Sequence, residues 1–481
     1  MPKNSNIEFS QDESYEWVGS FWFPEDQENK FSGKITYTPE QGVKIRLTQP
    51  DAEFKGFRHD PIAKKYMHGV AMGDKAQYLT LTDVYLTEST TYGNIRLTVL
   101  DGSGGGIIIG DHFTEADVKG LEFHYDEGFM NLFSNGFQKE RLTHEFSSQK
   151  PAKLISGLEY NLSWRTMGVP FDSVNELDTI FHSTDPNHLE EIKKVLEPLV
   201  NHGPPYLTKN YEWLTTIQLK QDKPLPLADL LKVEWKSRFF WETLLDHTIL
   251  VKSAWVLTDY TFNNNETHLR SYPFLNTFYK PKPQPGYLRS IHMLPINFFD
   301  FKNADDYLAA ISSPLDKWIE IMTEQAWQPV NHGLRRVYEA GHEMIDSSQF
   351  VSLVSEVETL LNLTSHKDTN LDCLIKNFGT EDWDKGVRKH LGSFDEEETV
   401  GEWISQIRNV ITHPKSGKKA NGKYLKVVND PFELQNVYSY TAGLFIKAVL
   451  SYLDIAEKDK LDTFMMKHIE MRACFKPITF V

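Results

Sequence analysis

The stretch VGEWISQIRNVITH, residues Val400–His413, predicts an amphipathic helix. Its apolar residues recur at the spacing that places side chains on one face of a helix: Val400, Trp403, Ile404, Ile407, Val410 and Ile411. Upstream, Ser393 and Glu396 fit a capping box, so we expect the helix to begin near residue 393. Downstream, Pro414 disfavours helical geometry at His413, so we expect the helix to end there.

The end of this predicted helix carries a cation and a titratable base, Arg408 and His413. A guanidinium stays charged and presents a fork of donors to phosphate oxygens, and an imidazole transfers protons near neutral pH. Asn409 lies four residues before His413, so we expect it to orient the ring. Because RNA supplies its own nucleophile, the 2′-hydroxyl, these residues favour metal-independent RNA cleavage that leaves 2′,3′-cyclic phosphate ends. The alternative is that His413 only caps the helix.

The charge around this motif is opposite to that of the whole chain. The 481 residues carry a net charge of −16, whereas proteins that coat nucleic acid are usually basic. Between Arg408 and Lys426, however, there are Lys and Arg residues and no Asp or Glu. The candidate RNA-binding residues of this segment are Lys415, Lys418, Lys419 and Lys423. The alternative interpretation is a solvated surface loop.

The chain as a whole predicts an α+β protein. Residues 1–145 show period-two alternation typical of strands, with a hairpin turn at Gly42. Residues 146–312 are mixed, with a helix expected over 225–245 and a proline-rich connector over 279–286. The glycine run Asp101–Gly106 is followed by no Gly-Lys-Ser/Thr, so a hairpin loop is favoured over a phosphate-binding loop.

Residues 313–481 predict an all-α bundle of amphipathic helices with short links. Ser313 suits a cap and Pro314 the first position of its opening helix. A further helix is expected over 350–361, and the last long helix is expected to be capped by Asp430, with Pro431 following.

Composition argues against several classes of protein. The two cysteines, Cys373 and Cys474, form no CxxC pair, and the histidines show no HExxH pattern, so we expect no metal site and no cofactor. The N-terminal residues lack the apolar core of a signal peptide, and the most apolar late run, 443–453, contains Lys447. We therefore expect a cytoplasmic protein without a membrane partner.

The C-terminal region, about 315–460, resembles the HEPN superfamily. Its ribonucleases carry an arginine, a polar residue, three variable residues and a histidine, which the segment Arg408–His413 matches. Residues 350–360 resemble the upstream helix that holds an acidic residue; Glu358 is the candidate, with Glu356 as the alternative. The resemblance implies a catalytic set of Arg408, Asn409, His413 and Glu358, and a homodimer or higher even oligomer in which two motifs form one site.

The N-terminal region is similar to the ApeA N-terminal domain in three places, Trp17–Pro24, Phe31–Tyr37 and Gly42. That domain precedes HEPN modules in anti-phage abortive-infection proteins. The resemblance implies a toxin-like endoribonuclease that responds to a phage-derived trigger or inhibitor protein.

Two other interpretations remain open. A HEPN bundle that binds RNA or a protein without cleaving it would use Arg408 only to hold phosphate. A sugar- or peptide-binding β-domain would use the aromatic residues Trp17, Phe21 and Trp22, although core packing is the favoured interpretation of these side chains.

Overall fold

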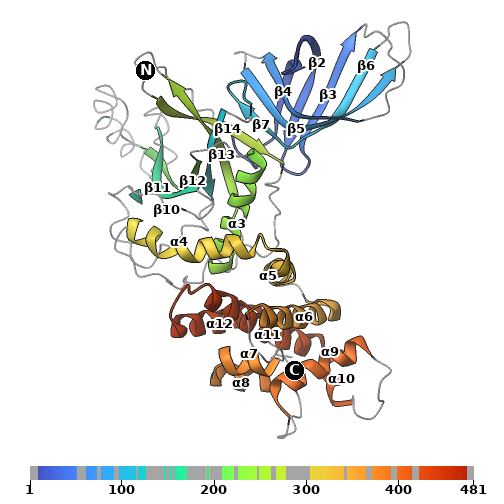
Figure 1. The fold of residues 1–481 in the computed structure, drawn as a ribbon, viewed down its shortest axis with the longest axis vertical. Helices are drawn as coiled ribbons and strands as arrows, with labels where there is room; N and C mark the ends of the chain where they lie inside the picture. The colour runs from blue at the N-terminus through green and yellow to red at the C-terminus, as the bar shows by residue number, and fades with distance from the viewer. Residues whose placement is uncertain are drawn as a thin grey trace.

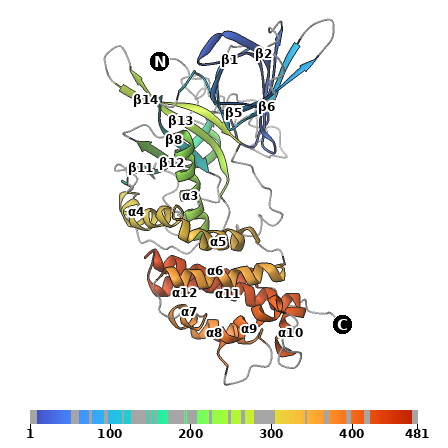
Figure 2. The same cartoon turned by 45° about the vertical axis from the view of Figure 1, so that its right-hand side comes forward.

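The structure is a computed structural model with strands at one end and helices at the other (Figures 1 and 2). It describes residues 9–50, 61–72, 77–91, 97–114, 117–125, 146–147, 152–153, 158–170, 191, 194, 208–221, 226–245, 249–261, 267–277, 304–340, 344–364, 371–391, 398–413 and 422–473. The α+β prediction is confirmed, with strands before residue 277 and helices alone after residue 303 among these residues.

The first six strands form a closed antiparallel ring. Around the ring the order is β1, β2, β3, β6, β5 and β4, and β4 pairs again with β1. The bounds of these strands are β1 Tyr15–Phe23, β2 Asp26–Thr38, β3 Gly42–Pro50, β4 Ile62–Met72, β5 Gln77–Thr91 and β6 Leu97–Gly104. The predicted hairpin at Gly42 is confirmed as the β2–β3 turn.

Alternation along the strands explains the interior of the ring. Inward-facing side chains form one apolar cluster, whereas their neighbours along each strand face outward. Trp17 and Phe21 belong to this cluster, which supports core packing over a ligand-binding role for these two side chains, whereas Trp22 is buried outside the cluster against His112.

The glycine run does not form the expected hairpin loop. Strands β6 and β7 (Gly106–Ile109) both pair with β5, so the chain continues in one direction across the run. The strand is interrupted at Gly105, where the backbone N–H donates to the Thr82 carbonyl at 2.7 Å. Strand β7 then pairs with β14, and this pairing joins the ring to a second sheet.

The second sheet is antiparallel, in the order β10, β11, β12, β8, β13, β14 and β7. Its strands are β8 Val118–Tyr125, β10 Ala152–Lys153, β11 Leu158–Pro170, β12 Thr208–Gln221, β13 Val251–Thr261 and β14 Thr267–Asn276, with β9 Phe146–Ser147 beside β11. Because β8 pairs with β12 and β13, segments on both sides of the expected boundary at 145/146 share this sheet. The proline-rich connector 279–286 lies outside the described residues.

Helix α3 (Leu227–Leu245) confirms the helix expected over 225–245 and packs on the second sheet (Figure 2). Two buried hydrogen bonds connect them. Tyr125 Oη donates to Glu234 Oε1 at 3.0 Å, and Trp241 Nε1 donates to Tyr160 Oη at 2.9 Å. These bonds satisfy polar groups that are costly to bury alone.

The helical region begins earlier than expected. Helix α4 spans Ala304–Ile321, so the expected boundary at 313 lies inside it, and the prediction that Pro314 opens a helix is wrong. A proline in a helix interior removes one backbone hydrogen bond. Ile311, Leu315 and Trp318 are fully buried around it, and this packing offsets the cost.

Most of the remaining helices pack against α11, which is buried on most of its surface. Their bounds are η5 Gln325–Trp327, α5 Gln328–Ala340, α6 Ser347–Leu363, α7 Leu371–Phe378, α8 Glu381–Arg388, α9 Val400–Thr412, α10 Gly422–Asn429, α11 Pro431–Tyr452 and α12 Lys458–Arg472. The Asp430 cap of α11 is confirmed, since its side chain accepts from the N–H groups of Phe432 and Glu433. None of the helices in the described ranges is both long and apolar enough to cross a membrane.

Candidate functional site

Helix α9 carries the sequence-predicted motif, and its apolar face is confirmed. Val400, Trp403, Ile404, Ile407 and Val410 are buried, and Ile411 is half-buried. The helix begins at Val400, however, and not near 393. Its capping box is Thr399 with Glu402, whereas Ser393 and Glu396 lie outside the described residues.

The end of α9 matches the expectation drawn from Pro414. His413 is the C-cap, with φ −131° and ψ 63°, so its backbone has left the helical conformation. Its backbone N–H donates to the Asn409 carbonyl at 2.8 Å, which fixes where the ring leaves the helix. His413 and Asn409 are both exposed. The imidazole therefore stands at a helix end that solvent can reach.

Arg408 contacts the acidic residue chosen from the upstream helix. Its Nη1 donates to Glu358 Oε1 at 2.5 Å, and this ion pair joins α9 to α6. The side chains are partly open, with 29% of Arg408 and 36% of Glu358 exposed. Glu358 is thus placed to hold the guanidinium at the surface beside the end of α9.

The alternative glutamate has a different environment. Glu356 is buried, and it forms an ion pair with Arg336 of α5. A Cβ atom built on Gly333 would lie 2.4 Å from Glu356 Oε2, so the backbone of α5 packs directly against this carboxylate. These contacts give Glu356 a structural position between α5 and α6, whereas Glu358 contacts the motif.

The predicted RNA-binding lysines are only partly described. Lys415, Lys418 and Lys419 lie outside the described residues. Lys423 lies in the first turn of α10, and not in a loop as expected. Its Nζ pairs with Glu398 Oε2 at 2.6 Å and lies 4.8 Å from the centre of the Trp403 ring.

Glu398 also binds a second side chain of α10. Tyr424 Oη donates to Glu398 Oε1 at 3.0 Å. Burial and this hydrogen bond to a carboxylate raise the pKa of Tyr424, so the phenol stays protonated as a donor. Glu398 was not predicted as a partner, because it precedes α9 and its contacts are with residues of α10 that lie 25 and 26 positions further along the chain. Its only sequence signal is an acidic residue next to the Thr399 cap.

Nowhere in the described ranges do three His, Cys, Asp or Glu side chains converge as metal ligands would. The candidate residues carry a guanidinium, a carboxylate, an imidazole and an amide, of which the guanidinium and the carboxylate are in contact. This set can bind an anion and transfer a proton.

Comparison with known protein families finds a match in the N-terminal region. The family model described as ApeA N-terminal domain 1 matches residues 16–184. This range contains the ring and the beginning of the second sheet, and it supports an ApeA-like defence protein, as the resemblance at Trp17–Pro24 predicted. No curated protein and no solved structure matches the chain.

Proposed function

We propose that this protein is a metal-independent endoribonuclease that acts as an abortive-infection effector in anti-phage defence. The ApeA-type N-terminal match supports the defence role. The observation that carries the catalytic proposal is the end of α9. There Glu358 holds the guanidinium of Arg408, and His413 leaves the helix into solvent.

The proposed chemistry assigns one role to each side chain. The 2′-hydroxyl of RNA attacks the neighbouring phosphorus while His413 accepts its proton. Arg408 stabilises the negative charge that develops on the phosphorane oxygens. A proton then goes to the leaving 5′-oxygen, so the products are a 2′,3′-cyclic phosphate and a 5′-hydroxyl. Asn409 and Glu358 position the histidine and the arginine.

The reaction needs both a base and an acid, and each chain has one motif histidine. We propose that the protein acts as a homodimer or a higher even oligomer, in which a second His413 protonates the leaving group. Lys415, Lys418, Lys419 and Lys423 are proposed to attract the RNA. Lys423 would have to exchange Glu398 for phosphate to do so.

The test is incubation of purified full-length protein with total RNA in EDTA, followed by end-group analysis of the fragments. We expect cleavage by the wild type, loss of cleavage with His413→Ala, and full cleavage with His332→Ala, an exposed histidine of α5 used as the matched control. Full activity of His413→Ala would contradict the proposal.

The second candidate function is an RNA- or protein-binding module without catalysis. The observation that favours it is the neutralised state of the site, in which Arg408 and Lys423 each hold a carboxylate. Tight RNA binding without fragments, including after addition of infected-cell extract, would support this function and exclude the nuclease.

A further inference from the structure

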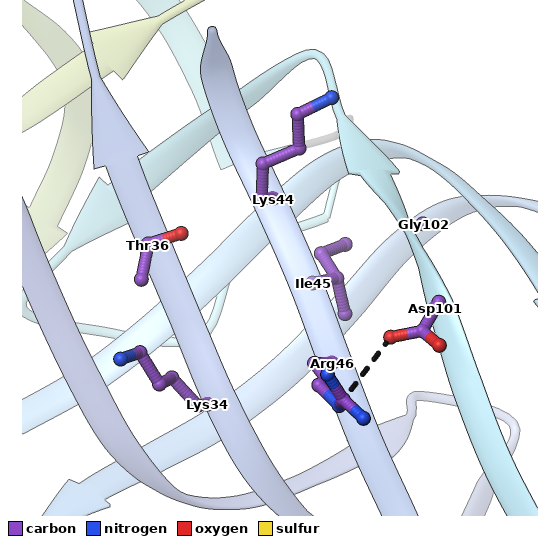
Figure 3. A pocket seen from close by; sticks show the side chains of 7 residues that line it. All are labelled: Lys34, Thr36, Lys44, Ile45, Arg46, Asp101 and Gly102. Carbon is purple, nitrogen blue, oxygen red and sulfur yellow. Dashed lines mark ion pairs between the residues drawn. The ribbon is translucent and has the colours of Figure 1, made fainter.

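A second basic site lies on the outer surface of the strand ring, far along the chain from the helical motif. An open cavity of about 590 Å³ lies over strands β2, β3 and β6 (Figure 3). The residues that line it are Lys34, Thr36, Lys44, Ile45, Arg46, Asp101 and Gly102. Three of the seven are cations, in a chain whose net charge is −16.

Strand register explains why the cations gather there. Lys34 of β2 lies opposite Arg46 of β3, and Thr36 lies opposite Lys44. The intervening residues Ile35 and Ile45 are buried in the ring, so the cations face outward. Lys44 and Arg46 are therefore about 7 Å apart along one strand, with Lys34 on the neighbouring strand about 5 Å away.

The cations are only partly neutralised. Like charges directly opposite each other destabilise a sheet, and Lys34 and Arg46 form such a pair. Lys34 binds Glu16 at 2.6 Å, but the Arg46 Nε to Asp101 Oδ1 distance is 3.7 Å, too long for a hydrogen bond. Lys44 is exposed and has no carboxylate partner among the described residues.

An exposed aromatic side chain lies on the same face. Lys44 is opposite Ser103 of β6, and Ser103 is opposite Tyr85 of β5. Tyr85 is 47% exposed, and two strand spacings place it about 10 Å from Lys44. Surfaces that bind single-stranded nucleic acid combine cations, which contact the phosphates, with exposed aromatic rings, on which the bases stack. This combination favours nucleic acid over an acidic peptide, which has no base to stack.

We propose that this outer face of the ring binds single-stranded nucleic acid. Lys44 and Arg46 contact phosphate groups, with the guanidinium exchanging Asp101 for phosphate oxygens, and Tyr85 stacks on a base. The site is separate from Arg408 and His413, so the N-terminal region would bind a ligand independently of the helical motif.

The test is fluorescence anisotropy of the full-length protein with a labelled 12-nucleotide DNA strand. DNA has no 2′-hydroxyl, so the proposed ribonuclease reaction does not consume the probe, and failure of one proposal leaves the other intact. We expect the Lys44→Gln, Arg46→Gln double variant to bind at least tenfold more weakly. Its slope of log K against log salt should fall by about 1.4, that is, about 0.7 for each lost phosphate contact.

Two further variants test the contributions of base stacking and of net charge separately from that of phosphate contact. Tyr85→Ala should weaken binding about tenfold without changing the salt slope. The matched control is Lys376→Gln with Lys389→Gln, two exposed lysines of the helical region, which makes the same change in net charge. This control should bind like the wild type, and thermal unfolding should show that every variant is folded.

Three outcomes would overturn the proposal. They are no binding by the wild type, equal loss in the control, and displacement of the DNA by polyglutamate at a lower charge concentration than by unlabelled DNA. If a free nucleotide displaced the labelled DNA as effectively as the unlabelled strand does, the site would still bind phosphate, but its ligand would be a mononucleotide.

Discussion

Arg408 on α9 donates from Nη1 to Glu358 Oε1 on α6 at 2.5 Å, which joins two helices whose contacting residues are 50 positions apart in the chain. About a third of each side chain is exposed, so water screens the pair and its contribution to stability is small, below about 1 kcal/mol. The pair is therefore better suited to positioning the guanidinium than to holding the bundle together.

Glu358→Ala should reduce RNA cleavage while leaving the fold stable. Without the carboxylate the guanidinium of Arg408 is free to rotate away from the phosphate, and such misplacement costs about 10- to 100-fold in rate. The free energy of unfolding should change by less than about 1 kcal/mol. Single-turnover cleavage and urea denaturation of the same preparations measure the two effects.

Glu358→Gln provides the matched control, because its amide oxygen can still accept from Arg408 Nη1. We expect it to keep more activity than Glu358→Ala. Equal activity of wild type and Glu358→Ala would contradict the positioning role.

Glu356→Ala, in contrast to Glu358→Ala, should lower the stability of the fold. Its carboxylate is buried against Arg336, and removing one partner of a buried pair leaves the other without compensation. Because Arg336 is itself about a third exposed, we expect a loss of about 2 kcal/mol in the free energy of unfolding. Equal urea midpoints for Glu356→Ala and Glu358→Ala would show that the two glutamates do not differ in this way.

The sequence predicted the motif helix better at its end than at its beginning. The apolar face of α9 and its termination at His413 follow from periodicity and from Pro414, which are local signals. The start was misplaced because Ser-x-x-Glu at 393 and Thr-x-x-Glu at 399 both fit a capping box. The second one directly precedes Val400, the first buried residue of the helix, and burial decided between them.

Longer-range features were not predictable from local patterns. Pro314 resembles a helix start, yet α4 runs through it because buried neighbours compensate for the lost bond. The closure of the ring joins β4 to β1, which no hairpin signal encodes. At the candidate site, the resemblance indicated Glu358 over Glu356, but the contact of Glu358 with Arg408 depends on how α6 packs on α9, which no local pattern encodes.

Gly42→Ala should destabilise the ring by about 1–3 kcal/mol. Gly42 has φ +68°, a conformation that costs other residues strain, and an added Cβ would lie 2.3 Å from Thr277 Cγ2. Gly422→Ala is the matched control, since its Cβ meets no atom within 4 Å and alanine suits the helix α10. Urea denaturation should show a loss for the first variant only. An unchanged midpoint for Gly42→Ala would contradict the proposed constraint.

His68 should make the stability of the ring fall as the pH falls. Burial lowers the pKa of His68, and the stacked ring of His112 at 4.6 Å acts in the same direction. The Phe113 carbonyl, 3.1 Å from Nε2, and Asp117 oppose this shift without cancelling it.

The sign of the effect follows from which state binds the proton first. As the pH falls below about 6.5, His68 binds a proton in the unfolded chain before it does so in the folded ring. The stability that the fold has above that pH is therefore lost as the pH decreases toward the lowered folded-state pKa of His68. Replacing His68 with Gln removes this titration but keeps a side chain that can donate to the Phe113 carbonyl. The difference in urea midpoint between pH 7.5 and pH 5.5 should therefore be smaller for His68→Gln than for the wild type. For His332→Gln, a change at an exposed histidine of α5, this difference in urea midpoint should equal that of the wild type. The same pH dependence in all three proteins would show that groups other than His68 determine the acid sensitivity of the fold.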